Sequence, residues 1–70
     1  MMPLTLANIG DENLIRHVGG SADVRKHLED MGFIAGTNVT VVSAFSGNLI
    51  VSVKETRVAL SRELASKIMV

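Results

Sequence analysis

The stretch from Leu28 to Val42 constrains the fold most, because within fifteen residues a helix ends, the chain turns twice and a strand begins. Gly32 follows the helical residues, and glycine readily takes the left-handed conformation that closes a helix. Gly36 marks a second turn, after which Asn38–Ser43 is rich in β-branched residues that favour a strand. The stretch therefore predicts a helix–turn–strand unit with structural roles for both glycines.

The helix of this unit is predicted to begin after Ser21, whose hydroxyl suits an N-cap. Val24, Leu28 and Met31 are spaced as one apolar face of about three turns. Charged residues fill the other sides, as expected for a helix whose second face meets water.

The rest of the chain reads mainly as short strands separated by turn residues. Strands are predicted at residues 12–18, 49–53, 56–60 and 69–70, an extended segment at 4–10, a loop at 44–48 and a tight break at 54–55. Ser61 is a second N-cap candidate, before a short helix with Leu60, Leu64, Ala65 and Ile68 on its apolar face. Such a series is typical of a small mainly β barrel, whose closure removes exposed strand edges.

Length and composition set further bounds. Seventy residues predict a single domain, 1–70, and the absence of cysteine excludes disulfides and thiolate metal sites. Seven basic residues balance seven acidic ones without forming a basic stripe, so nucleic acid is not an expected partner. No apolar run approaches the roughly 20 residues of a membrane span. With no secretory signal in view, we expect a cytoplasmic protein without direct membrane insertion.

The sequence offers few groups for chemistry. His17 and His27 are the only histidines, and neither stands in a spacing typical of a metal site. His27 shares a helix face with Asp23 and Met31, but two donors alone do not form a site. No nucleophile elbow and no phosphate-binding loop is present. We therefore expect no enzyme, no catalytic residue, and neither a cofactor site nor a metal site.

A binding surface is the more promising feature. Phe45, Ser46, Gly47 and Asn48 place an aromatic residue in a connecting loop, and loops on a rigid scaffold often carry recognition. An exposed phenylalanine could anchor a partner. The alternative is that Phe45 folds back and caps the barrel.

Several motifs together resemble the FeoA family. They are Leu28–Thr37, Gly47 in the hairpin, Arg57–Ala65 and the closing Ile68–Val70. The order and spacing of these motifs carry the resemblance over nearly the whole chain, from about Leu6. Three positions depart from the family pattern, with Ala35 and Leu49 in place of prolines and Glu55 in place of a glycine.

The resemblance implies an SH3-like β-barrel with one helix after the first strand and a short C-terminal helix. It also implies a non-enzymatic role in bacterial ferrous iron uptake, through binding to the GTP-binding domain of the FeoB transporter. The same domain type ends DtxR-type iron-dependent repressors, where it serves as an interaction module. The alternative function is a metal-responsive sensor or iron-handling module that binds Fe(II) or another divalent metal. Self-association stays open, because Val42 and Ile50 are aliphatic residues that a dimer would cover.

Overall fold

The computed structural model describes residues 1–70 and contains six strands, two α-helices and one 3₁₀ turn. In chain order these are η1 (Leu4–Leu6), β1 (Glu12–Leu14), β2 (His17–Val18), α1 (Ala22–Asp30), β3 (Asn38–Phe45), β4 (Asn48–Val53), β5 (Thr56–Ser61), α2 (Arg62–Ala65) and β6 (Ile68–Met69).

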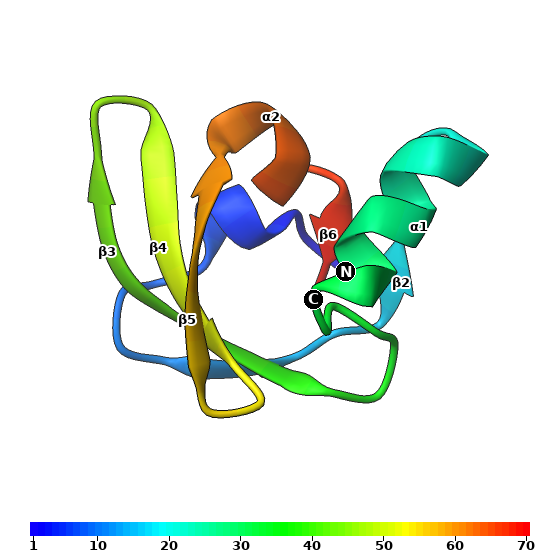
Figure 1. The fold of residues 1–70 in the computed structure, drawn as a ribbon. Coiled ribbons are helices and arrows are strands. Elements are labelled where there is room, and N and C mark those ends of the chain that lie inside the picture. Colours follow the sequence, from blue (N-terminus) through cyan, green and yellow to red (C-terminus); the bar gives the residue numbers. More distant parts are fainter.

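The strands form two antiparallel sheets. One has four strands in the order β1-β3-β4-β5, and the other pairs β2 with β6 (Figure 1). The strand ladders of the two sheets do not join, so hydrogen bonding does not close the barrel expected from the sequence. Both ends of the four-stranded sheet, at β1 and at β5, consequently remain edges.

The predicted unit of helix, turn and strand is present, and its geometry explains the glycines. Ser21 caps α1, its Oγ accepting from the Val24 amide at 3.3 Å. At the other end, Phe33 N–H donates to the Leu28 carbonyl at 3.0 Å and Gly32 N–H donates to the Glu29 carbonyl at 2.9 Å. Gly32 has φ +102°, the left-handed conformation of a Schellman C-cap.

This C-cap directs Phe33 into the core. A Schellman motif brings its last residue back against the final turn of the helix. Phe33 and Leu28, the two residues joined by the outer hydrogen bond, are both fully buried. Gly36, with φ +92°, then turns the chain into β3, and its amide donates to the Ile15 carbonyl at 2.8 Å.

The single strand predicted at residues 12–18 is wrong, because the segment divides into β1 and β2. Ile15, fully buried, exchanges backbone hydrogen bonds with the 36–37 turn, and Arg16 N–H donates to the Met69 carbonyl at 2.8 Å. The 12–18 segment therefore changes its pairing partner at this point, from β3 to β6. The first α-helix follows β2, and so comes after two strands instead of one.

Two other sequence predictions also fail near the termini. The segment expected to be extended at 4–10 begins with η1, closed by a bond from Ala7 N–H to the Leu4 carbonyl at 3.0 Å. Ile68 was expected on a helical face, but α2 ends at Ala65 and Ile68 pairs with Val18 in the small sheet. Both segments are too short for residue periodicity to distinguish helix from strand.

The core between the sheets, α1 and α2 consists of fourteen buried residues, all of them apolar. From the large sheet it takes the inward-facing residues Val39, Val41, Leu49, Val51, Val53 and Leu60. The rest of the chain completes it with Leu4, Ile15, Val18, Leu28, Phe33, Ala65, Ile68 and Val70. No polar side chain is buried, so packing of apolar groups supplies the core stabilisation.

The turn between β4 and β5 is conformationally strained. Lys54 and Glu55 have φ values of 48° and 63°, as a two-residue type I′ hairpin requires. A residue with a Cβ in this left-handed region is disfavoured by about 1–2 kcal/mol. Glu55 stands where a glycine would be relaxed, and the departure noted in the sequence falls on a position that needs positive φ.

Replacing Glu55 with glycine is therefore expected to stabilise the protein. Relief of strain exceeds the extra chain entropy lost by glycine, roughly 0.5–1 kcal/mol, and leaves a net gain of about 0.5–1 kcal/mol. A gain of that size raises the midpoint of thermal unfolding by roughly 2–8 °C. Glu63→Gly, the same change in the first turn of α2, should instead lower the midpoint. A loss of stability in Glu55→Gly comparable to that of Glu63→Gly would contradict the strain argument.

Candidate functional site

The residues selected as a binding loop lie at the tip of the β3–β4 hairpin (Figure 1). The expected loop at 44–48 is wrong in extent, because β3 continues to Phe45 and β4 starts at Asn48. Only Ser46 and Gly47 form the turn, with φ values of 47° and 77°. Phe45 therefore belongs to a strand end, paired across the hairpin with Asn48.

A β-bulge determines which way Phe45 faces. Val41 pairs with Val51, but the next partners along the strands are Ser43 and Ile50, which leaves Val42 as an extra residue. In a regular strand Ser43 and Phe45 would share the inward face of Val39 and Val41, because side chains alternate. The bulge reverses the alternation and turns Phe45 to the outer face. The side chain of Phe45 is 56% exposed.

The tip of the hairpin is held against the start of α2. The Gly47 carbonyl accepts from the Arg62 amide at 2.9 Å, and Asn48 pairs with Ser61 in the sheet. Ser61 also caps α2, its Oγ accepting from the Leu64 amide at 3.1 Å. These bonds fix the position of the tip relative to the core. An exposed aromatic side chain is thus presented from a preorganised backbone, which lowers the entropy lost on binding.

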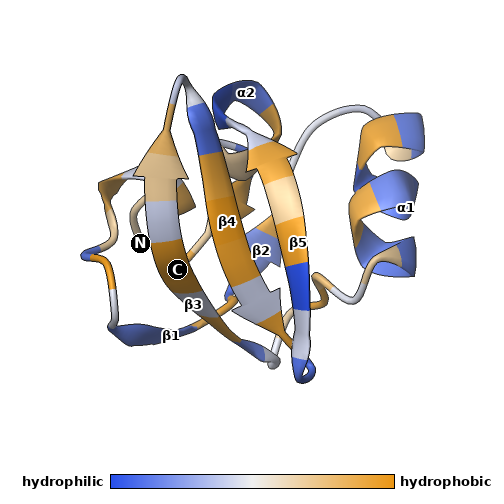
Figure 2. Cartoon of the chain, turned by 60° about the vertical axis from the view of Figure 1, so that its left-hand side comes forward, coloured by the Kyte–Doolittle hydropathy of each residue, from blue (hydrophilic) through white to orange (hydrophobic).

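The tip carries no charge and has one apolar neighbour on its own face. No residue from 44 to 48 carries a charge. Ile50 is a diagonal cross-strand neighbour of Phe45 on the same face, a distance that aromatic side chains can span. The segment that leads into β1 runs beside the part of β3 that extends beyond β1 (Figure 2), where Gly10 N–H donates to the Val41 carbonyl at 2.9 Å. Ile9 in this segment is 61% exposed.

Sequence reasoning selected the tip without Ile50, because only the pairing register places Ile50 diagonal to Phe45 on the same face. We use the term hairpin patch for Phe45 and Ile50 together with the 46–48 turn.

The remaining residues considered for chemistry are dispersed. His17 lies in β2 opposite Met69, and His27 lies on α1; both are exposed. No three side chains among histidine, cysteine, aspartate and glutamate are placed to hold a metal ion. The surface has no pocket that would enclose a small ligand. No helix is long and apolar enough to span a bilayer.

The architecture and the exposed hairpin define a small, mainly β, SH3-like protein. Residues 2–70 match the FeoA domain family, and the chain belongs to that family. A protein of Methanocaldococcus jannaschii, provisionally named Fe(2+) transport protein A, is 33% identical over 70 residues, which cover all of this chain and 85% of the relative.

Solved structures agree on the fold. A crystal structure of an iron uptake regulatory protein, FeoA, has a TM-score of 0.89 at 28% identity, covering 97% of this chain and 92% of that one. FeoA of Stenotrophomonas maltophilia, described as a prokaryotic SH3 domain protein complexed with zinc, has a TM-score of 0.85 at 23% identity, covering 99% and 88%. A manganese-dependent transcriptional repressor has a TM-score of 0.82 at 19% identity, covering 94% of this chain and 38% of the repressor chain. The SH3-like class expected from the sequence is confirmed.

Proposed function

We propose that this chain is a non-enzymatic accessory protein of ferrous iron uptake that binds the cytoplasmic GTP-binding domain of a FeoB-type transporter. Membership of the FeoA family and the name of the Methanocaldococcus relative support the connection with iron transport. A role as a ferrous iron transport activating factor has been suggested for the Stenotrophomonas protein. Binding to the transporter domain is the part that needs a direct test.

The observation that carries the proposal is the exposed Phe45 on a fixed hairpin. Aromatic residues that dominate binding energy typically enter a partner pocket while surrounding residues exclude water. Phe45 is exposed by 56%, and the turn beside it carries no charge that binding would have to desolvate. Ile50 provides apolar area beside that anchor. The hairpin patch is therefore suited to contact a complementary apolar surface of another protein.

Isothermal titration calorimetry with the isolated GTP-binding domain tests the proposal. This chain is added to the GTP-binding domain in three titrations, in which the domain is nucleotide-free, bound to GDP or bound to a GTP analogue. We expect saturable binding with a negative heat-capacity change, the signature of buried apolar surface. Absence of heat in all three states, with both proteins folded, would contradict the proposed partner.

The same protein is titrated anaerobically with Fe(II) alone. This arm tests the alternative of a metal-responsive module, for which saturable iron binding without the transporter domain would be the result. We expect no saturable iron binding, because His17 and His27 lie on separate elements without further ligands assembled around them.

A further inference from the structure

The outer face of the four-stranded sheet carries an ordered arrangement of residues, of which the proposed function uses only Phe45, Asn48 and Ile50. Cross-strand pairing defines three rows, which are Glu12–Thr40–Ser52–Arg57, then Ser43–Ile50–Ala59, then Phe45–Asn48–Ser61. We infer that this face pairs with the same face of a second copy about a twofold axis, with Glu12 of each copy opposite Arg57 of the other.

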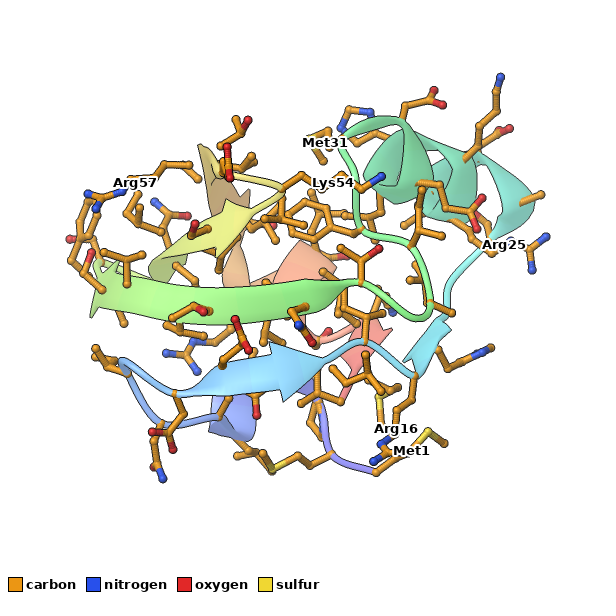
Figure 3. The ribbon with its side chains drawn as sticks, turned by 90° about the horizontal axis from the view of Figure 1, so that it is seen from below. Met1, Arg16, Arg25, Met31, Lys54 and Arg57 are labelled. Carbon is orange, nitrogen blue, oxygen red and sulfur yellow. The ribbon has the colours of Figure 1, made fainter.

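The first row places opposite charges at its two ends. Glu12 on β1 and Arg57 on β5 are both exposed, and Thr40 and Ser52 separate them. Neighbouring strands lie about 4.8 Å apart, so roughly 14 Å separates the two backbones. At that distance the two charged groups do not pair within one chain. Figure 3 shows Arg57 on the far side of β3 from β1.

A twofold axis makes this row complementary to itself. If the axis lies along the strands between β3 and β4, it brings β1 of one copy opposite β5 of the other. Glu12 then faces Arg57 twice, once on each side of the axis, as expected for an isologous interface. Thr40 meets Ser52 at the centre, where neither a charge nor a long side chain obstructs close approach.

The same twofold rotation also brings residues of the second and third rows opposite each other. The operation places Ser43 opposite Ile50, and Phe45 opposite Asn48 with Ile50 as its diagonal neighbour. Ile50 is half-buried in one chain and Phe45 is 56% exposed, so pairing removes apolar surface from water in both copies. Strands of two packed sheets usually align within about 30°, which this arrangement allows.

The expected dimer is weak. A standard interface buries about 800 Å² on each partner, which would be about one fifth of the 4145 Å² surface of this chain. The ten residues of the three rows fall short of the roughly 20–30 residues that such an interface uses on each side. The equilibrium should therefore depend on protein concentration and weaken as salt screens the two charge pairs.

Sedimentation equilibrium from micromolar to millimolar protein tests the inference with charge reversals. In Glu12→Arg or Arg57→Glu, both symmetry-related pairs change from attraction to repulsion, so the dissociation constant should rise by about tenfold or more. The double variant, Glu12→Arg with Arg57→Glu, recreates both pairs and should return to the unmodified dissociation constant within about threefold. Arg25→Glu and Glu29→Arg reverse charges on α1, away from the sheet, and serve as controls that leave association unchanged.

Each outcome decides the question. Weaker dimer formation in the single variants, with recovery in the double variant, would establish the pairing of Glu12 with Arg57. A protein that stays monomeric at all concentrations would overturn it. A dimer that tolerates the single reversals, or a double variant that does not recover, would also overturn it, because another face would then form the contact.

Discussion

Replacing Phe33 with alanine is expected to abolish cooperative folding. Phe33 is fully buried behind the Schellman cap of α1, and truncating a buried phenylalanine costs about 3–5 kcal/mol. A core in a chain of this length usually provides no more than about 3–5 kcal/mol in total. The free energy lost on truncation is therefore about as large as the whole free energy of unfolding. Urea titration followed by circular dichroism should show no native baseline, and the amide NMR spectrum should lose its dispersion.

The second phenylalanine provides the matched control. Phe45→Ala makes the same chemical change at an exposed side chain, and the free energy of unfolding should stay within about 0.5 kcal/mol of the original. A cooperative transition in Phe33→Ala with a loss below about 1 kcal/mol would mean that the core repacks around the site. It would also contradict the expectation that the core depends on Phe33.

Replacing Phe45 with alanine is expected to weaken binding to the transporter GTP-binding domain at least about 30-fold. A dominant interface residue contributes 2 kcal/mol or more on truncation, which corresponds to that factor in the dissociation constant. Because the hydrogen bonds that position the hairpin involve backbone groups, the variant should remain folded. Calorimetry on the folded variant measures the change in affinity directly.

The control for this variant removes an exposed aliphatic residue elsewhere. Ile34 is 40% exposed in the turn after α1, outside the hairpin patch, and Ile34→Ala should leave the affinity within about twofold. Equal losses in both variants would point to a general effect on the fold. Unchanged affinity in Phe45→Ala would exclude the hairpin as the anchor while leaving family membership untouched.

Local chemistry made a large part of the fold predictable. The cap at Ser21, the glycine after Met31 and the β-branched run after Gly36 each determine their own conformation through backbone preference. α1 and the β3–β5 meander therefore follow from the sequence. The 12–18 segment could not be resolved in the same way. Its alternation of residues predicts a strand but does not identify which neighbour each half pairs with, and the change of partner at Ile15 depends on tertiary structure.

The candidate site was predictable in position but not in orientation. The turn residues of the hairpin identify residues 45–48 from sequence alone. Whether Phe45 points into the core or away from it depends on the bulge at Val42, which shifts the alternation by one residue. Valine, serine and alanine around the bulge contain no signal for it. The two readings of Phe45, as anchor or as cap, could therefore be separated only with the pairing register.

An amide NMR titration with the transporter GTP-binding domain tests the central claim most directly. Isotope-labelled protein is titrated with the unlabelled domain, and the shifts are mapped onto the fold. We predict localised shifts at Phe45, Ser46, Gly47 and Asn48, extending to Ile50, with little change on α1. Shifts confined to α1 or to the β2–β6 sheet would contradict the hairpin as the binding surface. Unperturbed spectra at saturating domain would contradict the proposed partner itself.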